Sequence, residues 1–507
     1  MKAETRDQNA VVQYIENLLA YAEGKGLSSA EDRVFLRNSL YDLLSAAPAA
    51  EIPSPDLTDE AFPRDLYAIL DLCADTAAEK DLLDARVMGL FTPRPSEVNR
   101  IFEKNYKISP RAATDAFYVM CQNNHYIQAD RLAKNLYWLT KTEFGALEIT
   151  VNLAKPEKDP RDIAAAKALP QTGYPKCLLC MENVGFAGHL NHPARQNLRA
   201  VPVELAGETW YFQYSPYIYY NEHCIVLSPT HTPMSITAAT FRGLMEFLKK
   251  FPHYIIGSNS DIPIVGGSIL SHDHYQGGRH VFPLELAGIY ATYRHRSFPR
   301  VKASLVKWPM SVIRLESDDS ESLITLSTEI LENWKNYSDE SASVYAYTRT
   351  ETGNTPHNAI TPIARLNKHG LWEMDLVLRN NRTSDEHPLG IFHPHANLHH
   401  IKKENIGLIE VMGLAILPGR LKNDMDEMEA YLTGRAAREE AIAEHQPWLD
   451  EIKGRLPENA DVSAFIKNEI GNVFKRVLLD SGVFKTVPEG NRQFDGFMKQ
   501  CGFISDY

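Results

Sequence analysis

The sequence predicts an α+β fold with a helical first region, two β-rich units and a helical tail. Residues 1–160 carry apolar side chains mainly at helical spacing, and charged helical patterns return in residues 426–507. Between them, residues 161–300 and 301–425 each alternate short β-rich runs with one amphipathic helix. The similar make-up of these two stretches indicates a duplicated α+β unit, although no residue-level repeat is apparent.

The first region opens with an amphipathic helix. Its buried stripe is expected to consist of Val11, Ile15, Leu18, Leu19 and Ala22. Gly24 can end this helix, and Ser28 with Glu31 forms a capping box for the next one. The region shows no pattern of catalytic residues. Proline and charged residues cluster at 152–162, which predicts a domain boundary there.

The two middle units are predicted from runs of β-forming residues. In the first unit these runs are "ETWYFQYSPYIYY" (208–220) and "HCIVLSP" (223–229), and the helix is "SITAATFRGLMEFLKKF" (235–251). The second unit has "SVIRLES" (311–317), "ASVYAYTR" (342–349) and "WEMDLVLRN" (372–380), with the helix "SLITLSTEILENWKNY" (322–337). The tail is expected to be helical in "MDEMEAYL" (425–432) and "AAREEAIAEH" (436–445).

Composition indicates a globular protein of two or three domains. Of its 507 residues, 44% are hydrophobic and 23% are charged. The net charge of −12 argues against a general nucleic-acid binder. The sequence has no apolar run of about 18 residues and no signal-peptide pattern, so we expect a cytoplasmic protein without membrane attachment. Six cysteines are too sparse for a disulfide scaffold.

The stretch "GGSILSHDHYQGGRH" (266–280) is the strongest indication of chemistry. His272, His274 and Gln276 alternate, and in a β-strand their side chains project from one face. The flanking glycine pairs suit a close approach of the backbone to a ligand. The alternative is a polar strand edge or a titrating surface patch.

The pair "CLLC" is a candidate metal site. Cys177 and Cys180 have the C-x₂-C spacing with which two thiolates bind one tetrahedral ion, and His231 and His272 can complete a Cys₂His₂ set. A redox-active pair, or an accidental pair with unrelated surface histidines, remains open from the spacing alone.

The order CxxC, SPxH and HxHxQ resembles the galactose-1-phosphate uridylyltransferases of the histidine-triad superfamily. These motifs read "CLLCMENVGFAGHLNH", "VLSPTHTPMS" and "GGSILSHDHYQGG". Residues 393–421 resemble the second, bacterial class, and the resemblance covers roughly 165–425. It implies two histidine-triad-like half-barrel units and a UDP-glucose–hexose-1-phosphate uridylyltransferase of the galactose-utilisation (Leloir) pathway. The implied substrates are UDP-glucose and galactose 1-phosphate. The resemblance is also compatible with a homodimer.

The resemblance also implies residue roles. Cys177, Cys180, His231 and His272 match the ligands of a structural Zn²⁺. His274 matches the nucleophile and Gln276 the amide that binds the phosphoryl group. Histidine-triad hydrolases carry a third histidine in place of this glutamine, so transfer is favoured over hydrolysis. The alternatives are a nucleotide hydrolase or phosphorylase, and a zinc-stabilised nucleotide-binding protein without catalysis, which predicts a broken motif.

The chain departs from the better-known class of the family. A Tyr-Glu pair of that class is replaced by Leu414 and Ala415, and its "HPHPQ"-like motif by "HDHYQ". These changes argue against carrying over the hexose-phosphate contacts of the better-known class, and still more against carrying over a second metal site. Candidates for a second site are Glu285, His395, His399 and His400, with a solvated or substrate-facing cluster as the alternative.

Further polar residues are candidates for substrate contacts. Those beside the glycine turn or on basic segments are Asn197, Arg199, Asn259, Asp261, Ser268, His357, Asn358, Lys402 and Lys403. Tyr217, Tyr219 and Tyr220 can line the same side, although a tyrosine-rich strand also fits a core or a dimer surface. An exposed lysine pair such as Lys402 and Lys403 is often only solvated.

Overall fold

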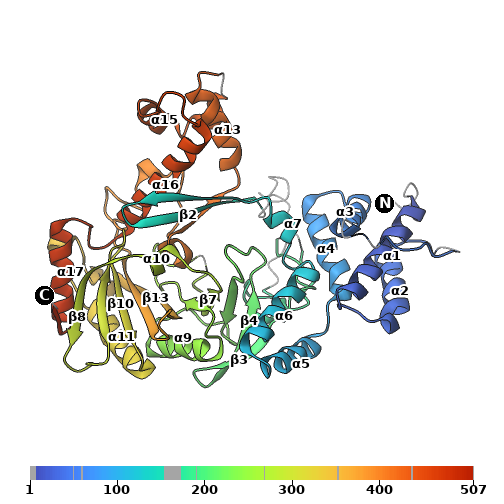
Figure 1. The fold of residues 1–507 in the computed structure, drawn as a ribbon, viewed down its shortest axis with the longest axis horizontal. Helices are drawn as coiled ribbons and strands as arrows, with labels where there is room; N and C mark the ends of the chain where they lie inside the picture. The colour runs from blue at the N-terminus through green and yellow to red at the C-terminus, as the bar shows by residue number, and fades with distance from the viewer. Residues whose placement is uncertain are drawn as a thin grey trace.

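The computed structural model has the predicted α+β architecture, built on one large sheet (Figure 1). It describes residues 7–48, 51–56, 58, 61–153, 173–189, 191–267, 269–350, 353–435 and 438–505. The large sheet has eleven strands in the order β16-β8-β9-β10-β14-β13-β6-β7-β5-β4-β3. Within the described ranges, no helix is both long and apolar enough to span a membrane.

The sheet consists of two units with the same strand order. The first contains β3 (Val201–Leu205), β4 (Glu208–Tyr214), β5 (Cys224–Leu227), α9 (Ala238–Lys250), β6 (Ile255–Gly257) and β7 (His274–Gly278). The second contains β8 (Ile289–His295), β9 (Lys302–Val306), β10 (Val312–Ser317), α11 (Ser320–Lys335), β13 (Asn358–Leu366) and β14 (Trp372–Asn380). Each unit is a three-stranded meander, a helix and a hairpin whose last strand pairs with the meander. The predicted duplication is therefore confirmed.

The two units join edge to edge through β6 and β13. These strands pair antiparallel, with Gly257 opposite Ile363, so the sheet runs without a break from one unit to the other. The stretch 342–349, expected as a strand, contributes only its end, as β11 (Tyr347–Thr350) in a small hairpin with β12 (Gly353–Pro356).

The two faces of the large sheet differ. Helices α9 and α11 cover one face (Figure 1). On this face, Tyr275 of β7 belongs to the same core cluster as Leu244 and Leu323. Gly243 allows this packing, because an added Cβ would lie 2.8 Å from the Tyr275 hydroxyl. Since side chains alternate along a strand, His274 and Gln276 project from the opposite face. That face carries the candidate site.

The first four helices form a core of their own. They are α1 (Gln8–Gly24), α2 (Arg33–Leu44), α3 (Ala61–Cys73) and α4 (Ala77–Phe91). The stripe predicted for α1 is buried in this core, and α1 ends at Gly24 as expected. The capping residue before the next helical turn is Ser29, whose hydroxyl donates to Asp32, so the prediction of Ser28 with Glu31 is wrong by one position.

The later part of the first region belongs to other layers. Helices α5 (Pro95–Tyr106) and α6 (Pro110–Asn123) pack on the first unit, where Phe102 and Phe117 contact Phe212, and the short α7 (Ala129–Leu132) follows. Residues after α7 are not helical, contrary to expectation. They form β1 (Leu136–Thr142) and β2 (Gly145–Asn152), which the β-favouring pattern of "YWLT" and "LEITV" supports.

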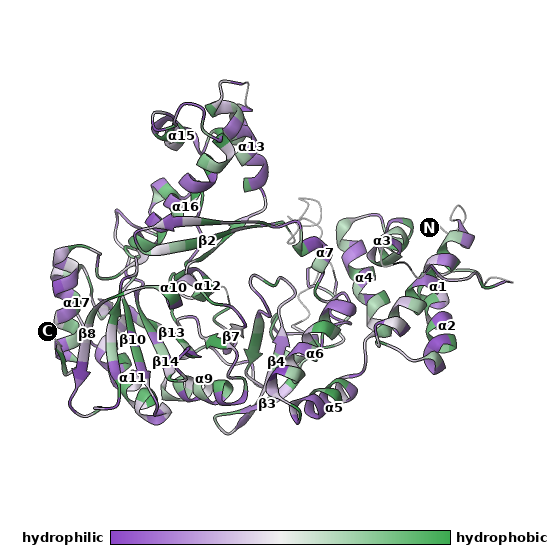
Figure 2. Cartoon of the chain, viewed as in Figure 1, coloured by the Kyte–Doolittle hydropathy of each residue, from purple (hydrophilic) through white to green (hydrophobic). Residues whose placement is uncertain are grey.

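A second, three-stranded sheet includes β1, β2 and β15 (Leu414–Pro418). β15 runs parallel to β2, with Leu414 opposite Glu148. Helix α16 (Val462–Ser481) packs on this sheet in a shared apolar cluster, and β2 is coloured largely hydrophobic in Figure 2. Gly471 permits the close approach, because an added Cβ would collide with the Thr140 side chain.

The remaining elements surround these two sheets. They are α10 (Pro283–Leu286), α12 (Leu408–Val411), α13 (Leu421–Leu432), α14 (Glu439–Ile442), α15 (Gln446–Lys453), α17 (Pro488–Gln500) and β16 (Phe503–Ser505). The tail is mainly helical as predicted, except that β16 adds an edge strand to the large sheet beside β8.

A buried ion cluster stabilises the helical region. His125 follows α6 and is 3% exposed, with Nδ1 3.0 Å from both carboxylate oxygens of Asp84 and Nε2 3.4 Å from Asp130. Burial alone lowers the pKa of His125, but the carboxylates of Asp84 and Asp130 outweigh it and raise this pKa to about 9.

This cluster predicts a pH-dependent stability. The folded-state pKa of His125 lies above the usual value near 6.5, so its contribution is complete below about pH 6.5 and is lost as the pH rises to about 9. At about 1.4 kcal/mol per pKa unit, the loss is of order 3 kcal/mol. The thermal midpoint of a His125→Asn protein should not show this decline at alkaline pH, because asparagine does not titrate. Asparagine is chosen because it tolerates the positive φ of 55° at this position. The exposed His369→Asn variant serves as the control, and an identical slope in all three proteins would disprove the assignment.

Candidate active site and metal cluster

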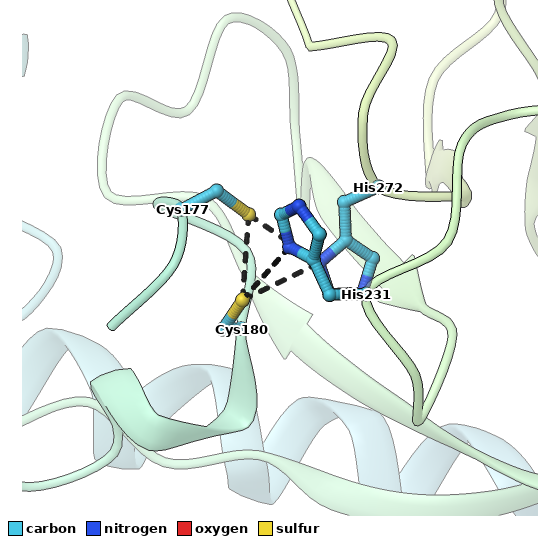
Figure 3. Close-up of side chains that lie close together, drawn as sticks. All are labelled: Cys177, Cys180, His231 and His272. Atoms are coloured by element: carbon cyan, nitrogen blue, oxygen red, sulfur yellow. Dashed lines mark hydrogen bonds between the residues drawn. The ribbon is translucent and has the colours of Figure 1, made fainter. Parts of the chain in front are cut away.

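Four side chains from three segments meet beside β7 (Figure 3). Cys177 and Cys180 lie in a turn closed by a hydrogen bond from the Cys180 N–H to the Cys177 carbonyl oxygen. His231 follows β5, and His272 lies just before β7 rather than within the strand. The ligand atoms lie within 4.8 Å of one another, so the structure brings together the four residues predicted as zinc ligands.

The spacing of these atoms fits a tetrahedral ion. The Cys177 Sγ atom lies 3.5 Å from Cys180 Sγ and 3.3 Å from His272 Nδ1. Cys180 Sγ lies 3.2 Å from His231 Nδ1 and 3.6 Å from His272 Nδ1. Zinc bonds of 2.0–2.3 Å in a tetrahedron require ligand separations of about 3.3–3.8 Å. The donor set and its size therefore suit Zn²⁺.

Outer hydrogen bonds hold the cluster in place. His272 donates from Nε2 to the Ser228 carbonyl oxygen at 2.9 Å, which leaves Nδ1 free to face the thiolates. The Asn183 amide donates to the carbonyl oxygens of Cys177 and Cys180, each at 2.8 Å. Sequence reasoning missed Asn183, although its place three residues after Cys180 could have suggested a turn-closing amide.

The four candidates for a second metal site are not brought together. Glu285 faces Arg365 at 3.9 Å, and His395 faces Asp480 at 3.5 Å. His399 lies 2.8 Å from the Pro394 carbonyl oxygen, and His400 pairs with His445 at 3.0 Å. Among the residues that the structure describes, only the Cys177 cluster brings three or more such side chains close enough to hold a metal ion.

His274 begins β7 and is oriented by its neighbour. Its side chain is 5% exposed, and its Nδ1 donates to the His272 carbonyl oxygen at 2.8 Å. Burial lowers the pKa of His274 to about 4, so the ring is neutral at physiological pH. With the proton held on Nδ1, the lone pair of Nε2 is available for attack on an electrophile.

Gln276 lies on the same face of β7 and is half-buried. Its Oε1 lies 3.1 Å from Nε2 of His223, the residue immediately before β5. Tyr219 and Tyr220 pack against the His223 ring, with centroid distances of 5.5 and 4.7 Å, so these tyrosines lie beside the site. Sequence reasoning missed His223, which belongs to no motif.

Asn197 and Arg199 make structural contacts instead of facing an open site. The Asn197 side chain donates to the Asn124 carbonyl oxygen at 3.2 Å. The Arg199 guanidinium donates to the carbonyl oxygens of Thr92 and Pro93, at 3.0 and 2.5 Å, and to two carbonyls of its own segment. These contacts attach the helical region to the first unit.

The polar residues near the glycine turn have mixed roles. Asn259 Oδ1 accepts from the Leu408 N–H at 2.8 Å, and Gly267 lies so close to the Asn259 amide that an added Cβ would be 2.6 Å away. Asp261 accepts from the Ile236 N–H at 2.8 Å, just before α9. Ser268 lies outside the described residues. Asn259 thus links the glycine turn of the first unit to α12.

The candidate substrate-binding residues from His357 onward include three whose side chains contact other groups of the protein. Asn358 donates to the carbonyl oxygens of Trp334 and Tyr337, at 2.6 and 2.9 Å, and His357 lies 2.7 Å from Thr348 Oγ1. Buried Lys402 donates to Glu410 at 2.8 Å.

Solvent exposure differs between two further sets of residues that the sequence singles out. Lys403, beside Lys402, is exposed. Leu414 and Ala415, which stand where the better-known class has its Tyr-Glu pair, are buried in β15.

Comparison with known proteins places the chain in a family. The family model of the galactose-1-phosphate uridyl transferase N-terminal domain matches residues 43–233, and that of the C-terminal domain matches residues 247–448. A galactose-1-phosphate uridylyltransferase of Caldanaerobacter subterraneus subsp. tengcongensis is 53% identical, covering 97% of this chain and 98% of the relative. Those of Bacillus subtilis and Halalkalibacterium halodurans are 49% and 50% identical, each over 97% of this chain and 98% and 99% of their own.

A solved structure, yeast Ap4A phosphorylase Apa2, matches with a TM-score of 0.31 and 12% identity, covering 65% of this chain and 90% of that one. The family models cover well over half of the chain, and the curated relatives match along nearly its full length. This chain therefore belongs to the galactose-1-phosphate uridyl transferase family.

Proposed function

We propose that the chain transfers a uridylyl group from UDP-glucose to galactose 1-phosphate through a covalent intermediate on His274. The observation that carries the proposal is the state of this ring: buried, neutral and held through Nδ1 by the His272 carbonyl oxygen. The names of the curated relatives and the match to both family models support the choice of substrates.

The reaction consists of two displacements at one phosphorus. In the first, Nε2 of His274 forms a bond to the α-phosphorus of UDP-glucose, the bond to the bridging oxygen breaks, and glucose 1-phosphate leaves with the electron pair. In the second, a phosphate oxygen of galactose 1-phosphate attacks the same phosphorus and the N–P bond breaks. UDP-galactose is released and the neutral imidazole is restored, so no net proton is consumed.

Gln276 is proposed to donate its amide to a non-bridging oxygen of the α-phosphate. Such a donor stabilises the charge that gathers there in the transition state, and the loss of one typically costs about 10²–10³ in rate. An amide does not supply a proton to a leaving group or activate water, which favours transfer over hydrolysis.

The Cys177 cluster is proposed to hold a structural Zn²⁺. The ion would tie the turn at 177–180, the segment after β5 and the turn before β7 into one body, and so fix the His272 carbonyl that orients His274. The closed set of four protein ligands leaves no position for a substrate, so no step of the reaction uses the ion.

The test is incubation of the protein with UDP-glucose alone. We expect a burst of one glucose 1-phosphate per chain, followed by almost no further release until galactose 1-phosphate is added. The burst should be read by rapid quench with labelled UDP-glucose. Continuous release of glucose 1-phosphate and UMP would identify a hydrolase instead, and no release would exclude the covalent route.

A further inference from the structure

The amide oxygen of Gln276 is paired with a histidine that no motif contains. His223 Nε2 lies 3.1 Å from Gln276 Oε1. The pairing follows from the register of β5 and β7, in which Ile225 stands opposite Gln276. His223 lies two residues before Ile225, so its ring extends along the sheet surface to the amide.

The His223 ring is fixed by its surroundings. Its backbone N–H donates to the Tyr220 carbonyl oxygen at 3.0 Å, and its carbonyl oxygen accepts from the Ser215 N–H at 2.9 Å. The residue is 2% exposed, and its ring packs against those of Tyr219 and Tyr220. Burial and these backbone hydrogen bonds therefore favour one position of the ring beside Gln276.

We propose that His223 is a positioning residue, which donates from Nε2–H to Gln276 Oε1 and so turns the Gln276 NH₂ group toward the reacting phosphate. The inference rests on the proposed function, since it specifies how the amide assigned to the α-phosphate is oriented. His223 itself does not touch the substrate.

The state of the other ring nitrogen supports this tautomer. His223 Nδ1 is buried without a hydrogen-bond partner among the described residues. If Nε2 carries the proton, the unpaired group is a lone pair; if Nδ1 carries it, a buried N–H is left unpaired, which is rarer in native proteins. Burial lowers the pKa of His223 to about 4, so the neutral ring holds one proton at physiological pH.

The other tautomer of His223 would turn the Gln276 amide the wrong way for phosphate binding. With Nε2 unprotonated, the Gln276 NH₂ group would turn to His223 and its carbonyl oxygen would face the phosphate. Phosphate oxygens only accept hydrogen bonds, so two acceptors would then meet where charge accumulates. The single hydrogen bond from His223 therefore decides whether Gln276 assists or hinders attack.

The first experiment observes the tautomer without any turnover. Nitrogen-15 NMR of the histidine-labelled, full-length protein should show His223 as the Nε2–H form between pH 6 and pH 8, with the assignment made by comparison with His223→Phe. Detection of the Nδ1–H form would overturn the proposal. This result is independent of whether UDP-glucose is a substrate, which the burst experiment decides separately.

The second experiment is a double-mutant cycle on the rate of glucose 1-phosphate release in a single turnover. His223→Phe keeps an aromatic ring but removes the donor, and should lower this rate about 10- to 100-fold with a smaller change in the KM for UDP-glucose. In a Gln276→Ala background the same substitution should change the rate less than about twofold, because the partner is gone. Equal losses in both backgrounds would show a merely structural role.

Two further variants sharpen the comparison. His223→Gln retains an N–H donor and should recover most of the rate lost in His223→Phe. His253→Phe is the matched control: burial also lowers the pKa of His253 to about 4, but its Nε2 pairs with Thr114 Oγ1 at 2.9 Å. This control should keep the wild-type rate. A rate in His223→Phe equal to that of wild type, or no recovery in His223→Gln, would contradict the proposal.

Discussion

Replacing His274 with glycine is expected to abolish the exchange of labelled glucose 1-phosphate into UDP-glucose, by about 10⁴-fold or more. The substitution removes the nitrogen that we propose to form the covalent bond, and we expect no neighbour to take its place. His272 shares the segment, but its Nδ1 faces the thiolates and its Nε2 donates to the Ser228 carbonyl oxygen. His272 therefore holds the site, whereas His274 is free to react.

The exchange is measured without galactose 1-phosphate, so it reports the first displacement alone. Zinc content and thermal midpoint of His274→Gly should stay close to those of wild type, because the cluster ligands are unchanged. Mass spectrometry of wild-type protein incubated with UDP-glucose should place UMP on His274. Exchange at the wild-type rate in the variant, or UMP on another residue, would show that the nucleophile is a different group.

Replacing Cys177 with serine is expected to damage the fold more than any other single change proposed for this protein. A structural zinc contributes of order 10–16 kcal/mol of apparent binding free energy near pH 7, and a serine hydroxyl is a poor ligand for it. Loss of the ion would also release the turn at 177–180 from His231 and His272. We expect zinc content to fall below about one tenth of an equivalent per chain and the thermal midpoint to drop by about 10 °C or more.

Metal analysis and a chelator titration of the wild-type protein provide the measurement. Cys73→Ser, which alters a cysteine of α3 outside the cluster, is the control and should retain both zinc and stability. A Cys177→Ser protein that is as stable and as active as wild type, or wild-type protein without zinc, would rule out a structural zinc at this cluster.

The sequence predicts the grouping of the four Cys and His side chains, because candidate ligands of one ion are recognisable by type and spacing. Cys177 and Cys180 are recognisable by spacing, and His231 and His272 are found with them in motifs of fixed order. By contrast, His223, which we propose to orient Gln276, is not predictable from any motif. His223 is separated from Gln276 by 53 positions, and only the register of β5 against β7 brings the two side chains together.

The tertiary partners of polar residues close to a motif are not predictable from the sequence. Asn197 and Arg199 precede the first unit by only a few residues, yet their donors pair with carbonyl oxygens at 92, 93 and 124. Such contacts with a region of no recognised motif are invisible without the tertiary structure. The strand at Leu414–Pro418 is not predicted for a different reason. A short apolar run fits a buried helix or a strand equally well.

The sheet of β1, β2 and β15 has a consequence for the growing chain on the ribosome. β2 ends at residue 152 and its parallel partner begins at residue 414, so 261 residues lie between them. At 5–20 residues per second, the outer edge of β2 waits roughly 15–50 s for its partner. During translation this hydrophobic edge is bare, and chains released before Leu414 should self-associate through it or require a chaperone.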